Sequence, residues 1–386
     1  MKYSIKLINY FENNDLGYNV RIIRLRSGGI DIDSLIKIPR YNIDKFIFTP
    51  VNEVYIKIPF SKIISMNVNS ISINYFIDKV SRRTKKDKIN ILIMEIFLDN
   101  IINNSVNKTL NLIVNFTAKV IYNTSNINII VPPLLNFKYE ISGSEATNIF
   151  LNMLYKLIEL LDTYIPNLKI AYLIPSYISE VSEFLEFYIE YFGYDGLIVL
   201  DLNGSTFSKI GYSRMGQVIR IMKQVYKSEN YGFYFFNHKS RKRSGRDVPS
   251  EDLLGLFSGG NFSGPSHKRI KMPLEVVNEL KKIGGDKLFN KDDFLFYPVN
   301  LAPNIKEFKI WVKENMSNIK NISYLIKIFN DIQINQQLSC LHKISPLEIL
   351  NSLKNNIFIN TLKDISRKIN RLLKNRPISE FLLQFS

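Results

Sequence analysis

The sequence predicts an α/β protein in which a parallel sheet follows a β-rich part and precedes a helical part. Between residues 126 and 260, short apolar runs alternate with segments of helical periodicity, and several of these runs end at proline or polar residues. Strands and helices that alternate with short connections favour right-handed βαβ units. The pattern fits a (β/α)8 barrel-like sheet, and an open doubly wound sheet is the alternative.

Most of the first 122 residues are expected to form strands, because they are rich in Ile, Val, Phe and Tyr and often alternate apolar with polar residues. The expected strands are residues 3–10, 18–25, 45–51, 54–59, 64–76 and 110–122. The apolar run 89–98 fits either a strand or a helix. This β-rich part, residues 1–122, can contribute the first strands of a barrel.

Residues 123–300 are expected to be the catalytic or binding core. Buried parallel strands are predicted at 127–131, 168–174, 196–202 and 232–237, and helices at 142–164, 179–192, 206–227 and 249–257. Ser142 or Ser144 is the expected N-cap of the first of these helices, with Glu145 in its first turn.

Residues 301–386 are expected to be a basic helical region. The predicted helices are 305–316, 322–337 and 346–373, the last of which carries Lys363, Arg367, Lys368 and Arg371.

The net charge of +16 is unevenly distributed along the chain. Residues 201–250 hold ten basic and three acidic side chains, whereas residues 151–200 hold two basic and seven acidic ones. Clustering of this kind favours a surface that faces a polyanion, that is, RNA or DNA. A solvated basic face without a partner is the alternative.

Cysteine and histidine counts restrict the chemistry. One cysteine excludes an intramolecular disulfide, and three histidines leave too few ligands for a Cys/His zinc site. No leader-like apolar stretch opens the chain, and no run of about 18 apolar residues indicates a membrane span. We expect a cytoplasmic protein with no membrane association, metal or cofactor.

Ligands of parallel α/β folds bind at the carboxyl ends of strands, so polar residues that follow predicted strands are candidate site residues. Asp201 follows the apolar run 197–200 and can act as a general base or a nucleophile. Its alternative role is an Asx-type turn with Asn203 and Gly204.

The segment 238–246 follows another predicted strand and is strongly basic. Arg side chains suit phosphate oxygens through paired N–H groups, and Lys supplies a mobile point charge. A solvated charged loop is the alternative. The expected nucleic-acid contacts here, besides His238 at the strand end, are Lys239, Arg241, Lys242, Arg243 and Arg246.

A glycine-rich turn is the second candidate anion site. Ser258, Gly259, Gly260 and Asn261 allow a close backbone approach to a ligand, and they precede basic residues. The segment lacks the ending of a Walker A loop and is no dinucleotide fingerprint, so a plain turn is the alternative. The basic residues that follow are His267, Lys268 and Arg269.

Three short stretches resemble the tRNA-guanine transglycosylase superfamily, whose fold is a (β/α)8 barrel. Arg24-Leu-Arg-Ser-Gly-Gly with Phe48-Thr-Pro-Val is similar to the family's opening, and Leu256-Phe-Ser-Gly-Gly-Asn-Phe is similar to the strand that presents its nucleophilic aspartate. That family exchanges a guanine in RNA, or in DNA for some relatives, for a deazapurine through a covalent carboxylate intermediate. Here Asn261 occupies the position of the nucleophile, and the family's Cys-rich zinc site is missing.

The preferred hypothesis is therefore a transglycosylase-like protein that acts on a nucleic-acid base, as in tRNA modification. Asp201 is the expected nucleophile or base and Asp247 the second carboxylate, while His238, Asn203 and residues 258–261 line the substrate pocket. A non-catalytic nucleic-acid-binding protein on a degenerate barrel is one alternative. A sugar-phosphate or nucleotide enzyme is another.

Overall fold

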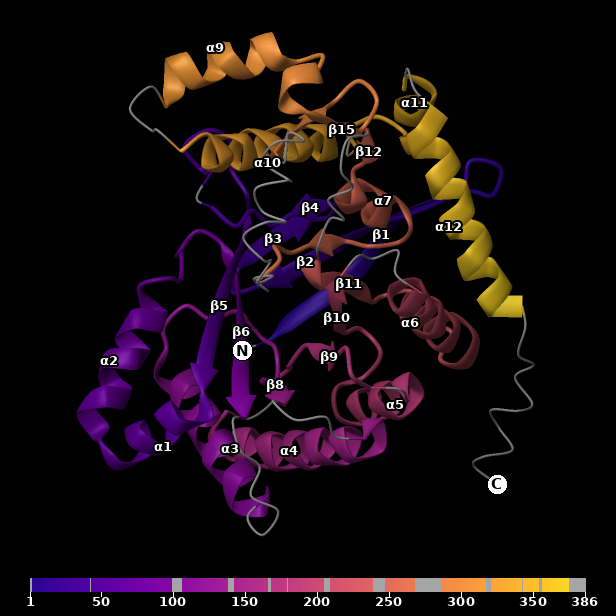
Figure 1. Cartoon of the computed structure of the whole chain (residues 1–386). Helices are drawn as coiled ribbons and strands as arrows, with labels where there is room; N and C mark the ends of the chain where they lie inside the picture. The colour runs from indigo at the N-terminus through magenta and orange to yellow at the C-terminus, as the bar shows by residue number, and fades with distance from the viewer. Residues whose placement is uncertain are drawn as a thin grey trace.

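A computed structural model describes most of the chain, and its strands lie at the centre with helices arranged around them (Figure 1). The described residues are 2–41, 43–98, 106–137, 142–165, 168–178, 180–204, 209–238, 247–267, 286–316, 321–341, 343–353 and 356–374. They form a mixed α/β structure that contains parallel sheets.

The chain begins with an antiparallel sheet of β1 (Tyr3–Asn13), β2 (Tyr18–Ser27) and β3 (Ile30–Asp33). The strands predicted at 3–10 and 18–25 are confirmed, and both are a few residues longer than expected. Gly28 and Gly29 join β2 to β3 with positive φ angles of 58° and 79°. Glycine adopts this left-handed backbone without the steric penalty of a side chain.

Five strands form a parallel sheet in the order β4 (Ile36–Lys37), β13 (Phe262–Ser263), β11 (Gly232–His238), β10 (Leu197–Gly204) and β9 (Tyr172–Ile174). Each neighbouring pair is parallel. The apolar residues that begin β10 and β11 are fully buried, as in a sheet covered on both faces. The parallel strands predicted at 196–202 and 232–237 are confirmed, and of the one predicted at 168–174 only Tyr172–Ile174 forms a strand.

A second parallel sheet contains β5 (Val51–Pro59), β6 (Ile89–Leu98), β7 (Ile129–Ile130) and β8 (Leu134–Phe137). β6 is central and pairs with β5, β7 and β8. The ambiguous run 89–98 is therefore a strand, and it is buried along almost its whole length. The amide of Ala171 donates to the carbonyl of Ile130 at 2.8 Å, so β9 of the first sheet adjoins β7 of the second.

Helices connect the parallel strands. They are α1 (Phe60–Val68), α2 (Ser70–Ser81), α3 (Val106–Asn123), α4 (Gly143–Tyr164), α5 (Val181–Phe192), α6 (Lys209–Arg220), which continues as a π-helical turn at Ile221–Val225, and α7 (Glu251–Phe257). Ser142 caps α4 as predicted, because its hydroxyl accepts from the amide of Glu145 at 3.2 Å.

Two predicted strands are wrong. Residues 64–76 lie in α1 and α2, and residues 110–122 lie in α3. The buried residues of α3 include Leu110, Ile113, Val114 and Thr117, a spacing of three and four that places them on one helical face. Their β-branched composition favoured a strand, and packing of that face against α4 and α1 overrode it. Of the strand expected at 45–51, only Val51 lies in a strand, as the first residue of β5.

The remaining elements are β12 (Val248–Pro249), β14 (Lys287–Asn290) and β15 (Leu295–Pro298) in an antiparallel sheet, a 3-10 turn at Val299–Leu301, and α9 (Ile305–Asn315), α10 (Ile322–Cys340), α11 (Pro346–Asn351) and α12 (Asn356–Lys374). The predicted C-terminal helices are confirmed, except that the last one is divided into α11 and α12. None of the helices in the described ranges has the length and apolar character needed to cross a bilayer.

Candidate functional site

Polar side chains from several parallel strands meet in one group, near the carboxyl ends of β8 and β11 and in the first half of β5. We call this group the carboxylate cluster. Its members are Glu53 and Tyr55 of β5, Glu95 of β6, Asn136 of β8, Asp201 of β10, Asn237 of β11, and His267, which follows β13. Hydrogen bonds and one ring stack join all seven residues into a continuous series of contacts.

Glu95 lies near one end of this series of contacts and is 1% exposed. The hydroxyl of Tyr55 donates to Oε2 of Glu95, and Nδ2 of Asn136 donates to Oε1 at 2.8 Å. Burial raises the pKa of Tyr55, and the hydrogen bond to Glu95 and the negative charges of Glu95, Glu53 and Asp201 raise it further. The hydrogen bond to Glu95 and these negative charges favour the protonated phenol at neutral pH.

His267 connects Tyr55 to two further residues. Its ring stacks on the ring of Tyr55, with a centroid distance of 3.7 Å and an interplanar angle of 17°. Nε2 of His267 bonds to Oε1 of Glu53, and the amide of His267 donates to Oδ1 of Asn237 at 3.3 Å. Burial raises the pKa of Glu53, and the bond to His267 only partly opposes that effect.

Asp201 lies at the other end of the series of contacts and is 1% exposed. Its Oδ1 accepts from Nδ2 of Asn237 at 3.0 Å, and its Oδ2 accepts from the amide of Ser176 at 3.3 Å. Asn237 has a φ of 54°, a left-handed conformation that asparagine tolerates better than most residues, so strand β11 turns where it meets Asp201. Both carboxylate oxygens are held in place.

Arg214 of α6 fixes the loop that contacts Asp201. Its guanidinium donates to the carbonyls of Pro175, Ser176 and Ile178 at 3.0, 2.5 and 2.7 Å. Burial lowers the pKa of Arg214, and the charge of Asp201 opposes this effect. Arg214 therefore acts as a positioning residue for the amide of Ser176.

Two buried polar atoms of the site have no hydrogen-bond partner among the described residues: Oε2 of Glu53 and the hydroxyl of Tyr234 on β11. Both converge on Gly264. A Cβ at that position would lie 2.4 Å from the Tyr234 hydroxyl and 3.0 Å from Oε2 of Glu53. Because an unpaired buried polar atom is costly, these atoms are suited to a polar group of a ligand or to water.

The predicted site residues are only partly brought together. Asp201 and His267 belong to the carboxylate cluster, although His267 was expected to contact phosphates. Asn203 and His238 lie in the last residues of β10 and β11. Asp247 is exposed before β12, where its charge acts on Lys287 of β14, outside the cluster.

The expectation that residues 258–261 line the same pocket as Asp201 is wrong. Ser258, Gly259, Gly260 and Asn261 are buried and precede β13, so they lie at the amino end of that strand. Asp201 pairs with Phe236, whereas the amide of Asn261 bonds to the carbonyl of Phe233, three residues earlier on β11. The reason is that β13 is short and begins only at Phe262.

The remaining predicted contacts lie outside the described residues. They are Lys239, Arg241, Lys242, Arg243, Arg246, Lys268 and Arg269. In the chain they directly follow His238 and His267.

The sequence-based prediction missed Glu53, Tyr55, Glu95 and Asn136. One signal was present, because Glu95 is the only charged residue in the apolar run 89–98. A lone carboxylate in a buried strand is costly and therefore indicates a functional role. Within the described ranges, no group of three or more His, Cys, Asp and Glu side chains is arranged to hold a metal ion. No family model and no curated protein matches the sequence.

Proposed function

We propose that this protein is an enzyme that cleaves and re-forms the glycosidic bond between a sugar and a base of a nucleic acid. The observation that carries the proposal is the group of three carboxylates with buried side chains, Glu53, Glu95 and Asp201, which contacts through Tyr55, His267 and Asn237 join across parallel strands. Glycosidic chemistry needs one carboxylate to attack or stabilise a cationic anomeric carbon and a second acid to protonate the leaving group.

A (β/α)8 barrel is the proposed frame of the site. The order β4-β13-β11-β10-β9 continues through the bond between Ala171 and Ile130 to β7, β6 and β5. With β4 placed next to β5, these strands follow one another in chain order, with β7 and β8 sharing a position, and that β4–β5 neighbourhood is what the barrel proposal adds. The carboxylate cluster supports this proposal, since its contacts join β5, β6 and β8 to β10 and β11. Active sites of such barrels lie at the carboxyl ends of the strands.

Asp201 is the proposed nucleophile, because Asn237 and the amide of Ser176 hold both of its oxygens. One carboxylate oxygen would form a bond to the anomeric carbon as the carbon–nitrogen bond breaks. The electron pair of that bond leaves with the base, which takes a proton from Glu53. An incoming base or water then attacks the same carbon, returns its proton to Glu53 and releases Asp201.

Glu53 is the proposed acid because burial raises its pKa, which keeps a larger fraction protonated near neutral pH. The resemblance to the transglycosylases agrees with this placement, since Phe48-Thr-Pro-Val leads directly into β5, the strand that carries Glu53. The net charge of +16 and the basic residues that follow His238 and His267 support a polymeric nucleic acid as substrate.

A base-exchange assay tests this function. The protein would be incubated with radiolabelled guanine and either transfer RNA or genomic DNA, and both label incorporation and release of free base would be measured. Asp201→Asn should lower the rate by about 1,000-fold or more, because it removes the nucleophile, while Kd for the nucleic acid stays within about threefold of wild type.

Asp247→Asn is the matched control, since it neutralises an exposed carboxylate outside the cluster. It should retain wild-type rates. Wild-type protein that neither releases nor exchanges a base in RNA or DNA would leave only the binding alternative. An equal loss in both variants would remove the assigned role of Asp201.

A further inference from the structure

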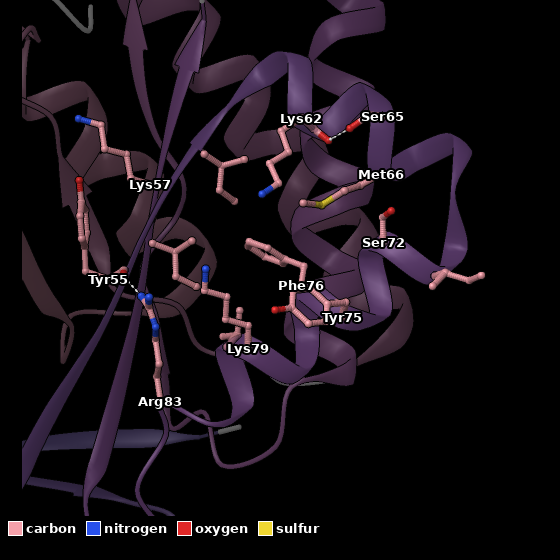
Figure 2. Close-up of a pocket in the computed structure, with 14 residues that line it drawn as sticks. Tyr55, Lys57, Lys62, Ser65, Met66, Ser72, Tyr75, Phe76, Lys79 and Arg83 are labelled. Carbon is pink, nitrogen blue, oxygen red and sulfur yellow. Dashed lines mark hydrogen bonds between the residues drawn. The ribbon is translucent and has the colours of Figure 1, made fainter.

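A pocket of about 720 Å³ lies on the opposite face of β5 from the carboxylate cluster, between that strand and helices α1 and α2 (Figure 2). Its floor is apolar and buried, formed by side chains such as Ile56, Ile58, Met66 and Phe76. A volume of this size lies within the usual range for ligand pockets.

The charged residues that line the pocket all have the same sign. Lys62, Lys79 and Arg83 line it, together with the β5 residue Lys57, whose Nζ lies 3.9 Å from the centroid of the Phe97 ring, and none of the described lining residues is Asp or Glu. None of these four cations takes part in a salt bridge among the described residues. Figure 2 shows Lys62 of α1 and Lys79 of α2 extending into the space beside β5. The pocket is therefore complementary to an anion.

The rim also carries exposed apolar surface. Tyr75 is 70% exposed and Ile71 is 78% exposed, and both line the pocket. An exposed aromatic ring beside free lysines is the combination with which proteins hold single-stranded nucleic acid, because bases stack on the ring while cations contact the phosphates. A small inorganic anion would leave the apolar surface uncovered.

One strand joins this pocket to the proposed active site. Side chains alternate along β5, so that Glu53, Tyr55 and Lys57 lie on the side of the cluster while Ile56 and Ile58 face the helices, and the cations that extend into the pocket are those of α1 and α2. Arg83 reinforces the connection, since its Nη1 donates to the carbonyl of Tyr55 at 2.9 Å. A polymer bound in the pocket lies one strand away from the reacting groups.

We infer that the pocket between β5 and the α1–α2 helices holds a single-stranded segment of the nucleic acid that flanks the target base. This inference rests on the proposed function, because it takes the substrate to be a polymer. The lysines contact phosphates, and Tyr75 stacks on an unpaired base. The contact is therefore sequence-tolerant, and it contributes affinity and positioning.

Fluorescence anisotropy with a labelled 12-nucleotide oligo(dT) and its RNA equivalent tests the inference. The double variant Lys62→Gln/Lys79→Gln should weaken binding about tenfold and lower the slope of log Kd against log salt by about 1.4, since each phosphate contact on a single strand contributes about 0.7. Tyr75→Ala should weaken binding about fivefold or more without changing the slope. All substituted side chains are exposed, so folding should be unchanged by circular dichroism.

Lys306→Gln/Lys309→Gln is the matched control, because it removes the same charge from exposed positions on α9. It should bind as wild type does. The inference is overturned if the control loses as much affinity as Lys62→Gln/Lys79→Gln, or if that variant loses affinity for polyglutamate and not for oligonucleotides, which would indicate an acidic protein partner.

The same variants separate this inference from the proposed function. If binding depends on the pocket but no base exchange occurs, the role inferred for the pocket is supported and the proposed function is contradicted. Base exchange with an unchanged KM in Lys62→Gln/Lys79→Gln would support the proposed function and contradict the role inferred for the pocket.

Discussion

Buried polar residues in this protein are of two kinds, which differ in whether their hydrogen bonds are complete. Asn261 is fully buried, and both ends of its amide are engaged: Nδ2 donates to the carbonyl of Arg21 at 2.6 Å and to Oγ of Ser34 at 3.2 Å, and Oδ1 accepts from the amide of Phe233 at 2.9 Å. Glu53, by contrast, keeps one buried oxygen without a partner among the described residues. The completed amide of Asn261 stabilises the fold, whereas the unpaired oxygen of Glu53 is available to a substrate, and each oxygen of Asp201 keeps a second lone pair beside the one bond it accepts.

Asn261→Asp distinguishes a structural residue from a lost nucleophile. The change removes two donated hydrogen bonds and buries a carboxylate, so we expect the free energy of unfolding to fall by about 2–4 kcal/mol, with no gain of base exchange. Urea denaturation measures the loss. Asn115→Asp, on the exposed face of α3, should change stability by less than about 0.5 kcal/mol. A stable Asn261→Asp variant with increased activity would show that this position belongs to the active site.

At the scale of elements, the last described helix packs against the start of the chain. α12 contacts α6, α7 and β2, and Figure 1 shows it beside α6. Phe358 of α12 is fully buried and its ring lies 5.2 Å from that of Phe294. Gly17, in the turn between β1 and β2, approaches so closely that a Cβ there would lie 2.6 Å from the Cα of Lys363.

Gly17→Ala tests this contact. The alanine would adopt a φ of 74° and would also force the backbones of the turn and α12 apart, so we expect a loss of about 2–4 kcal/mol in the free energy of unfolding. Gly29→Ala is a matched control, because its φ is 79° and nothing lies within 4 Å of the new Cβ. It should cost about 1 kcal/mol. Equal losses in thermal or urea unfolding would mean that backbone strain alone, and not the helix contact, explains the effect.

At the scale of the whole molecule, a buried charged group joins the parallel sheet to α7 and to the C-terminal helix α10. Nζ of Lys37 in β4 lies 2.8 Å from Oδ2 of Asp252 in α7 and 3.8 Å from Oδ1 of Asp331 in α10. Burial lowers the pKa of Lys37, but the two carboxylates outweigh that effect and its pKa is raised. Burial raises the pKa of Asp331 to about 6, against the partial opposition of Lys37.

This raised pKa predicts a pH-dependent stability. Between about pH 4 and pH 6 the folded protein holds a proton on Asp331 that the unfolded chain has released, so the contribution of this group to stability falls as pH rises through that range and is constant above it. A shift of about two pH units corresponds to about 3 kcal/mol. We expect the unfolding free energy of wild type minus that of Asp331→Asn to fall by up to this amount between pH 4 and pH 7.

Urea unfolding of both proteins at pH 4, 5, 6 and 7 measures that difference. A difference that stays constant with pH would show that Asp331 titrates alike in the folded and unfolded chains.

Short-range features were predictable from the sequence by itself. The alternation of strands and helices from β9 to α7, the cap at Ser142 and the C-terminal helices all depend on periodicity and on residues within one turn of each other. Those signals are local, so they survive without knowledge of the rest of the fold. Asp201 was also predictable, because it follows a buried apolar strand directly.

Only the tertiary structure decided which polar residues share a site. Residues 64–76 and 110–122 became helices because one face of each is buried against the rest of the fold, which composition does not reveal. Glu53, Tyr55 and Glu95 are brought to Asp201 by the order and register of strands that are up to about 150 residues apart in sequence. Asn261, though suggested by a motif, is assigned to the core because β13 begins after it. Strand order and register arise from long-range packing, and these decide which side chains form the candidate site.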